Sequence, residues 1–308
     1  MVNIKSIRYR DIIQFRKIPS LECTNLSSYQ MSKGLFSGTL KSINLGKSSI
    51  GIGESHSKIL SKGILPKDKI TFITILKVVD NMSVLKAHKI TKNMLFCLDE
   101  HSEISSVFTP GILWVSFQIP RKELELLGFD FKKYSNTFIN ATNKHARIAS
   151  KKIHHLINHL YHLSQEELLY LNPKEIHKNI LSIHLDAFNH TKKLNKVDKE
   201  SYRIIATKTY DYILAHSNYT ITMHDLSKAI KTSERTLQRA FKLYYHTTLQ
   251  NFIKIHRLHK VRQKLLASSP NETITEIAFD NGFSHLGRFA QNYKNLFGEL
   301  PSDTYKRT

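Results

Sequence analysis

The sequence has few cysteines and no long apolar run. Only Cys23 and Cys97 occur among 308 residues. Two are too few for a disulfide scaffold or a zinc site built from thiolates, and so low a count favours a reducing compartment. No stretch approaches about 18 consecutive apolar residues, so we expect no membrane span. Residues 1–5 lack the basic and then apolar pattern of a secretory signal. We therefore expect a soluble, cytoplasmic protein that does not bind membranes.

Acidic residues are also scarce. The chain has 46 Lys and Arg but 25 Asp and Glu, which gives a formal net charge of +21. Hydrophobic residues make up 41% and aromatic residues 10%, which is enough for packed cores and excludes a disordered basic tail. The length predicts two domains. A polyanion is the expected partner, with DNA or RNA favoured over anionic lipid.

The sequence offers little for metal binding or catalysis. His155 and His159 have the i, i+4 spacing of zinc ligands on a helix, but no Cys or carboxylate lies among the neighbouring histidines. A solvated helix face is the favoured interpretation of these residues. Neither a Gly-x-Ser-x-Gly nucleophile motif nor a phosphate-binding loop occurs. Cys97 lies in an apolar run and is expected to be buried. We therefore expect no enzyme, no metal and no cofactor.

The first 120 residues have the pattern of a β domain. Short runs rich in Ile, Thr, Val and Phe alternate with Gly and Ser, notably at 49–53, 70–76, 94–98 and 112–117. Several short strands at near-regular spacing predict a barrel or a sandwich.

From about Pro120 the apolar residues adopt helical spacing. One stripe consists of Ile153, Leu156, Ile157, Leu160 and Leu163. It is either the inner face of the N-terminal domain, which is favoured, or a dimer seam. Further along, Asn172 and Pro173 are expected to begin a helix. The polar segment Leu194–Glu200 is the candidate linker.

The last third of the chain contains a weak internal repeat. Residues 225–242 and 276–294 each have an acidic-aliphatic start, a short helix, a turn and an apolar pair at i, i+4. The offset between the copies grows from 51 to 52 residues, so the second turn should be one residue longer. The pattern predicts helix-turn-helix motifs at about 222–243 and 274–295, joined by one helix over 249–267.

The second helix of the first copy has two different faces. Ser233 can cap it, while Leu237 and Phe241 anchor it inside. The opposite face has the side chains that contact DNA in such motifs, since Arg pairs with guanine, Gln with adenine, and Lys with phosphate. These side chains are Arg235, Gln238, Arg239 and Lys242. The alternative is a solvated basic face, which the presence of two copies makes less favoured.

Residues 201–308 resemble the DNA-binding domain of AraC/XylS-type bacterial transcription regulators. Three segments, 233–242, 274–289 and 297–302, carry the resemblance, and similarity to the family's cupin-like sensor barrel is much weaker over the first 120 residues. The resemblance implies an α+β chain. Its expected parts are a cupin-like β-barrel or sandwich with flanking helices that senses or dimerises (1–140), a helical region with the linker (141–200), and an all-α DNA-binding domain with two helix-turn-helix motifs (201–308).

The resemblance also implies a set of DNA contacts. Side chains expected to face bases are Arg235, Gln238 and Arg239 in the first motif, and Leu286, Gly287, Arg288 and Gln291, with Ala290, in the second. Side chains available for phosphate are Ser233, Lys242, Lys254, Arg257, Arg262 and Lys294. Two positions depart from the family pattern. Lys231 stands where Gly is usual, at a cost of about 1 kcal/mol if φ is positive, and Leu249 stands where Pro often begins the linking helix.

The sequence thus predicts a sequence-specific transcription regulator that binds promoter DNA. A small-molecule effector, a homodimer and, for an activator, RNA polymerase are further expected partners. One alternative is an enzyme domain fused to the DNA-binding unit, such as an alkyl-transfer domain, which needs a reactive Cys in a polar motif unlike Cys23 or Cys97. The other is a nucleoid-type protein that binds DNA without sequence preference.

Overall fold

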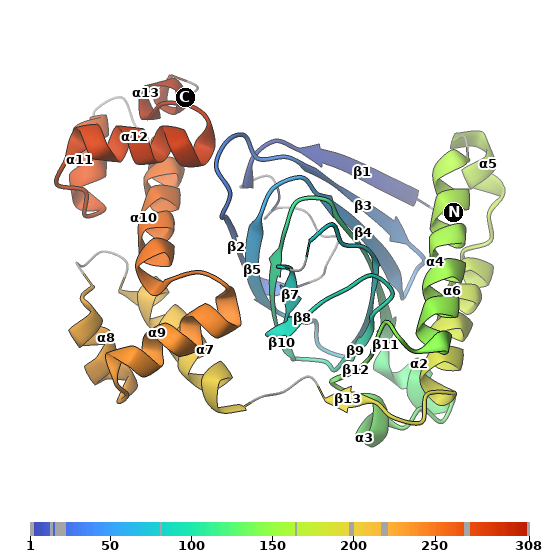
Figure 1. Cartoon of the computed structure of the whole chain (residues 1–308). Helices are drawn as coiled ribbons and strands as arrows, with labels where there is room; N and C mark the ends of the chain where they lie inside the picture. The colour runs from blue at the N-terminus through green and yellow to red at the C-terminus, as the bar shows by residue number, and fades with distance from the viewer. Residues whose placement is uncertain are drawn as a thin grey trace. The chain divides into compact units, whose positions relative to one another are not determined.

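The computed structural model describes residues 3–12, 15, 23–80, 82–163, 165–196, 200–216, 221–267 and 272–306. Strands dominate the first part of the chain and helices the last (Figure 1), which confirms the predicted α+β class. The chain divides into two compact units. Unit 1 consists of Met1–Ser28, Ser37–His56 and Ser61–Asp198, and unit 2 of Tyr29–Phe36, Ser57–Leu60 and Lys199–Thr308.

Within the described ranges the strands form two separate sheets, not one closed barrel. The eight-stranded sheet has the order β1 (Asn3–Tyr9), β3 (Gly38–Asn44), β4 (Ser49–Ser55), β11 (Ile112–Pro120), β6 (Lys69–Lys77), β9 (Leu95–Leu98), β12 (Thr137–Ile139), β13 (Asn195–Lys196). The five-stranded sheet has the order β2 (Thr24–Gln30), β5 (Ile59–Ile64), β10 (Glu103–Phe108), β7 (Val84–Leu85), β8 (His88–Lys89). The four apolar runs singled out in the sequence lie in β4, β6, β9 and β11, as predicted.

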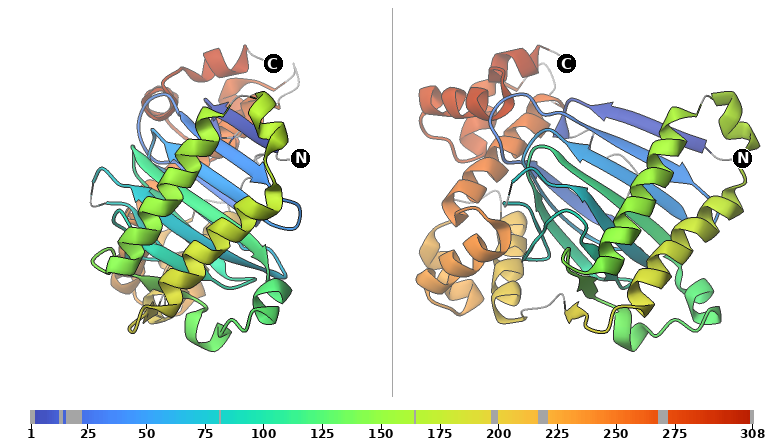
Figure 2. Two further views of the ribbon diagram at one scale, coloured as in Figure 1. Left: turned by 90° about the vertical axis from the view of Figure 1, so that its right-hand side faces the viewer. Right: turned by 45° about the vertical axis from the view of Figure 1, so that its right-hand side comes forward.

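Two long helices cover one face of the eight-stranded sheet. Helices α4 (Lys144–His162) and α6 (Pro173–Asn189) lie side by side across it (Figure 2). They run antiparallel, because the ring of His145 near the start of α4 stacks on that of His190 after the end of α6, with ring centroids 5.4 Å apart. The shorter helices of this unit are α2 (Arg121–Leu126), α3 (Phe131–Tyr134) and α5 (Gln165–Tyr170).

The apolar stripe of α4 belongs to the core of unit 1. Ile153, Ile157 and Leu160 are buried in one cluster with Phe72 and Phe117 of the sheet. Leu156 and Leu163, the other two residues of the stripe, are partly buried against the same cluster, so the stripe contributes to the core of unit 1 as the favoured interpretation predicted.

Local polar contacts in unit 1 also follow the sequence. The Asn172 side chain accepts a hydrogen bond from the backbone N–H of Lys174 at 3.0 Å, and Pro173 is the first residue of α6, as expected. Cys97 is fully buried, as predicted. Two residues of the candidate linker form β13, which pairs with β12, and Glu200 at its end is the first residue of the next helix. Residues 197–199 of the linker lie outside the described part of the chain.

Unit 2 is built around one central helix. Helix α10 (Leu249–Leu265) has 17 residues and a length of about 26 Å. In Figure 1, α8 and α9 lie at one end of it and α11 and α12 at the other. The other helices of the unit are α7 (Glu200–Ala215), α8 (Met223–Ile230), α9 (Glu234–Tyr245), α11 (Ile274–Asp280), α12 (Leu286–Phe297) and α13 (Pro301–Tyr305).

An aromatic cluster forms the core of unit 2 and includes a residue distant in sequence. The Phe252 ring of α10 lies 5.1 Å from the Tyr210 ring, 5.3 Å from the Phe241 ring and 5.3 Å from the Tyr29 ring. The Tyr29 hydroxyl is also hydrogen-bonded to Nδ1 of His256, at 3.0 Å. Segment 29–36 therefore completes a core that the helical pattern alone did not predict.

None of the described helices has both the length and the apolar character needed to cross a bilayer.

Candidate nucleic-acid interface

The first helix-turn-helix is defined by local caps. At the start of α8 the Thr222 hydroxyl accepts from the Asp225 backbone N–H at 3.1 Å, and the Asp225 carboxylate accepts from the Thr222 backbone N–H at 3.0 Å. These reciprocal hydrogen bonds satisfy donors that a helix start leaves open. The Asp225 carboxylate also accepts from the Thr222 hydroxyl at 2.6 Å, and this hydrogen bond, together with that from the Thr222 backbone N–H, lowers the pKa of Asp225. The next helix, α9, is capped by Ser233, whose hydroxyl accepts from the Thr236 N–H at 3.2 Å, as the sequence predicted.

Helix α9 separates an inner face from an outer one. Leu237 and Phe241 are fully buried, and they anchor the helix as predicted. The opposite face is exposed and has the four side chains that the sequence singled out, Arg235, Gln238, Arg239 and Lys242. The Arg239 guanidinium lies 5.5 Å from the centroid of the Tyr202 ring of α7, a cation–π arrangement that helps to position it.

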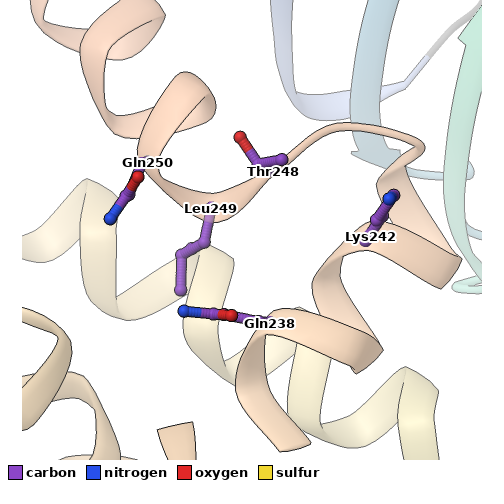
Figure 3. A pocket seen from close by; sticks show the side chains of 5 residues that line it. All are labelled: Gln238, Lys242, Thr248, Leu249 and Gln250. Carbon is purple, nitrogen blue, oxygen red and sulfur yellow. The ribbon is translucent and has the colours of Figure 1, made fainter. Parts of the chain in front are cut away.

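Two of these side chains share a pocket with the start of α10. Gln238 and Lys242 of α9 face Thr248, Leu249 and Gln250 across a cavity of about 230 Å³ (Figure 3). The Thr248 hydroxyl caps α10 by accepting from the Asn251 N–H at 3.2 Å. Leu249 is the first residue of α10 and is buried, so a leucine can take the place of the usual proline.

The second helix-turn-helix repeats this plan with fewer polar groups. Thr273 and Glu276 form the same reciprocal cap at the start of α11. Helix α12 has no side-chain cap, and it packs inward through Phe289 and Tyr293, as predicted. Of the residues that the sequence singled out on α12, Leu286, Arg288, Gln291 and Lys294 have exposed side chains, Gly287 lies beside them and Ala290 is half-buried.

Hydrogen-bonding capacity is lower on α12 than on α9. The Gln291 side-chain amide donates to Oδ1 of Asn295 at 3.1 Å. Leu286, which is 37% exposed, is the large apolar side chain at the helix start.

The turns of the two motifs differ at one equivalent position. Lys231 ends α8 in the left-handed conformation, with φ 55° and ψ 49°. Gly282, 51 residues later, has φ +79°. The conformational cost expected at Lys231 is therefore present in the first motif and absent from the second.

The predicted phosphate contacts on α10 have three different environments. Lys254 is exposed. Arg257 is half-buried, and its guanidinium lies against the turn at Gly282, where an added Cβ would be 3.3 Å from Cζ. Burial lowers the pKa of Arg257.

The expectation that Arg262 is available for phosphate is wrong. Its side chain is buried, and Nη1 lies 2.7 Å from Oε1 of Glu299. The same nitrogen donates to the Tyr293 hydroxyl and to Oγ1 of Thr304, both at 3.3 Å. Arg262 therefore joins α10 to the end of the chain. Its spacing from Leu258 and Leu265, four and three residues away, is the signal that could have shown an inward position.

Neither metal binding nor thiol chemistry is supported in the described part of the chain. His155 and His159 are exposed on α4, and the described residues contain no group of three or more His, Cys, Asp or Glu that could hold a metal ion. Burial raises the pKa of Cys97 well above its ordinary value and that of Cys23 to about 12. Both thiols are thus protonated at neutral pH, unlike a nucleophilic cysteine.

Residues 226–307 match the family described as a helix-turn-helix domain. The XylDLEGF operon transcriptional activator of Pseudomonas putida is 33% identical over 153 residues, which are 42% of this chain and 48% of that protein. The protein named "Probable thc operon regulatory protein" of Rhodococcus erythropolis is 40% identical over 94 residues, 30% of this chain and 28% of that protein. The chain therefore spans less than half the length of either relative.

Part of this chain is also similar to solved structures. The crystal structure of a probable AraC family transcriptional regulator from Rhodopseudomonas palustris CGA009 matches with 32% identity and a TM-score of 0.33. The match covers 34% of this chain and 96% of that chain.

Proposed function

Because this chain belongs, through its C-terminal domain, to the AraC/XylS-type transcription regulators, we propose that it binds promoter DNA in a sequence-specific manner and thereby regulates transcription. The observation that supports this most directly is the exposed polar face of α9, held outward by the buried Leu237 and Phe241. Arg and Gln at successive turns of a capped helix are the side chains that pair with base edges in the major groove.

The two motifs have unequal roles in this proposal. Helix α9 contacts bases through Arg235, Gln238 and Arg239. Helix α12 mainly holds the DNA backbone through Arg288 and Lys294, because its other exposed groups offer few hydrogen bonds. Gly287 allows close approach of the backbone, and Leu286 suits a thymine methyl group.

Phosphate contacts supply the part of the affinity that does not depend on sequence. Lys242 and Lys254 are exposed cations that fit this role, and Ser233 has a hydroxyl at the start of α9. Helix α10 is about 26 Å long, somewhat less than the roughly 34 Å between successive major-groove segments on one face of DNA. The proposal therefore includes a bend of the DNA toward the protein.

The proposal extends to partners and location. A small-molecule effector acting on the N-terminal part of the chain, a homodimer, and RNA polymerase for an activator belong to it as expectations from the family resemblance. A cytoplasmic location follows, because promoter DNA lies there. The proposal includes no enzymatic step, and the protonated thiols support that choice. Measuring self-association and DNA affinity of the full chain with and without candidate effectors tests these parts.

The experiment for DNA recognition begins with selection of bound duplexes from a random pool by the full-length protein. Arg239→Ala is then compared with the wild type on the selected duplex and on an unrelated duplex at one salt concentration. A good base contact is worth about 1–3 kcal/mol, so we expect a roughly 5- to 150-fold loss on the selected duplex and little change on the other.

Lys174→Ala is the matched control, because it removes one exposed positive charge in unit 1. It should leave the ratio of the two affinities unchanged. Equal losses on both duplexes for Arg239→Ala would reassign this residue to phosphate. A random pool that yields no preferred sequence would favour the nucleoid-type alternative.

A further inference from the structure

Segment Tyr29–Phe36 of unit 2 extends from α10 to the end of α12. It begins at the Tyr29 hydroxyl, which is hydrogen-bonded to Nδ1 of His256 at 3.0 Å. The backbone N–H of the next residue, Gln30, donates to Nε2 of His259 at 3.1 Å, about one turn further along α10. Consecutive residues of the segment therefore contact consecutive turns of the helix that joins the two motifs.

The same segment caps the carboxyl end of α12. The last four carbonyl groups of a helix lack partners within the helix. In α12 the Asn295 carbonyl accepts from the Gly34 backbone N–H at 3.0 Å, and the Leu296 carbonyl accepts from the Gln30 side-chain amide at 2.6 Å. Two of the four end carbonyls of α12 thus have their partners in a segment from the other end of the chain.

The side chain of Gln30 is buried for the sake of these hydrogen bonds. It is 2% exposed, and burial of an amide is unfavourable unless the amide is hydrogen-bonded. Besides the Leu296 carbonyl, its nitrogen lies within hydrogen-bond distance of the carbonyl oxygens of Ser32, at 3.0 Å, and Gly34. An apolar side chain of similar length would fill this space without such requirements. The amide therefore ties the turn of its own segment to the end of α12.

Backbone contacts hold the segment on both of its sides. The Met31 N–H donates to the Lys58 carbonyl at 2.8 Å, and the Lys58 N–H donates to Oγ of Ser32 at 3.0 Å. On the other side lies Gly298, the residue after α12, where an added Cβ would be 3.1 Å from the backbone nitrogen of Leu35. The segment is thus a fixed support for α12.

A helix that holds DNA must itself be held in one direction. The amino end of α12 is joined to α11 by a short turn. Towards its carboxyl end, Arg262 of α10 donates to the Tyr293 hydroxyl at 3.3 Å, and segment 29–36 holds the backbone. Arg288 and Lys294 are exposed on this helix of 12 residues, so a swing of its carboxyl end would move both side chains relative to the DNA.

We propose that Gln30 is a positioning residue for the second DNA contact. It fixes the direction of α12 and thereby allows this helix to hold the DNA backbone, without contacting DNA itself. The inference rests on the proposed function, because it takes α12 as a helix that contacts DNA. It adds to that function a requirement for residues from the first part of the chain.

Hydrogen exchange of the full-length protein without DNA, measured by mass spectrometry, tests whether Gln30 holds α12. Gln30→Met removes the amide and keeps a side chain of similar length. It should speed exchange in residues 294–298 about tenfold, the effect of losing roughly one net hydrogen bond, and leave α9 unchanged. Gln263→Met is the matched control, because Gln263 is exposed on α10 and is not a proposed DNA contact. It should change exchange in neither helix.

Footprinting tests the consequence for DNA binding. The full-length proteins are compared on the duplex selected from a random pool, at equal occupancy of the window contacted by α9. This window is identified as the one whose base preference Arg239→Ala relaxes. Gln30→Met should reduce protection of the other window at least threefold. Fluorescence energy transfer between the labelled ends of the duplex should also report a smaller bend, whereas Gln263→Met should match the wild type.

Circular dichroism checks that each variant is folded. If Gln30→Met does not fold, Gln30→Asn takes its place, because it keeps an amide that is too short to reach the Leu296 carbonyl. Unchanged exchange at the end of α12 would overturn the proposal, and so would equal losses in the two windows, which a general loss of stability produces. Stronger protection of the α12 window would overturn it too, since the segment would then restrain the helix.

A random pool without a preferred duplex would contradict the proposed function. The exchange measurement needs no DNA, so it would still decide whether Gln30 holds α12.

Discussion

Replacing Lys231 with glycine should stabilise unit 2. Lys231 has φ 55° and ψ 49°, a conformation that costs a residue with a Cβ about 1–2 kcal/mol. Glycine removes this cost but makes the unfolded chain more flexible, which offsets about 0.4–1 kcal/mol. The expected net gain in unfolding free energy is about 0.5–1 kcal/mol. For a domain of this size that gain raises the melting temperature by roughly 2–6 °C.

The second motif supplies the reciprocal substitution. Gly282→Ala should destabilise unit 2 by about 1 kcal/mol or more, since φ is +79° and the new Cβ would lie 3.3 Å from Cζ of Arg257. The guanidinium can shift slightly, so the backbone conformation, not the contact, should dominate the loss.

Thermal unfolding of the full-length protein, followed by circular dichroism at 222 nm, is the assay for both substitutions. Lys231→Ala is the control, because it removes the same charge but retains a Cβ in the left-handed conformation. If Lys231→Gly melts no higher than Lys231→Ala, the strain argument fails. The same conclusion follows if Gly282→Ala melts as high as the wild type.

Three further predictions concern buried charge, pH and the DNA footprint. Arg262→Met should lower the unfolding free energy by about 3–5 kcal/mol, because it removes one partner of the buried ion pair with Glu299. The control is Lys254→Met on the exposed side of α10, for which denaturant unfolding should show a loss of unfolding free energy below about 0.5 kcal/mol. Equal losses in the two variants would contradict a structural role for Arg262. Burial lowers the pKa of His184 to about 4. The neutral ring therefore contributes fully to the unfolding free energy above about pH 6.5, and this contribution, up to about 3 kcal/mol, is lost as the pH falls from there toward 4. Urea unfolding, followed by the fluorescence of the single tryptophan Trp114, should show this loss. His184→Phe should make the unfolding free energy less dependent on pH. An unchanged pH profile in that variant would assign the loss to other titratable groups. Footprinting with the full chain should show two protected windows about ten base pairs apart on one face of the duplex, whereas windows on opposite faces would contradict a rigid α10.

The elements that local chemistry determines could be predicted from the sequence. The caps at Thr222, Ser233 and Thr273 each involve residues three positions apart, so the helix starts can be recognised without tertiary structure. The apolar runs of β4 and β6 likewise have strand composition along their whole length. The alternation of buried and exposed positions on α9 gave its exposed face correctly.

Features that depend on distant residues could not be predicted. The arginine at position 262 fits a basic surface as well as an ion pair, and only the fold brings Glu299, 37 residues later, to 2.7 Å from it. The set of segments that form unit 2 could not be predicted for the same reason, because no local pattern assigns Tyr29–Phe36 to a helical unit at the other end of the chain. The separation into two sheets depends on strand pairing, which the spacing of runs leaves open.

The place of Tyr29 in the core of unit 2 has a consequence for protein synthesis. Tyr29 and His256 are 227 residues apart in sequence. At about 5–20 residues per second, a ribosome adds His256 some 11–45 s after Tyr29. During that interval helix α10, on which Tyr29 packs, has not been synthesised. Residues 29–36 therefore lack this packing partner while the neighbouring strands are already being translated. Helix α10, one of the later segments to be translated, thus packs on one of the first.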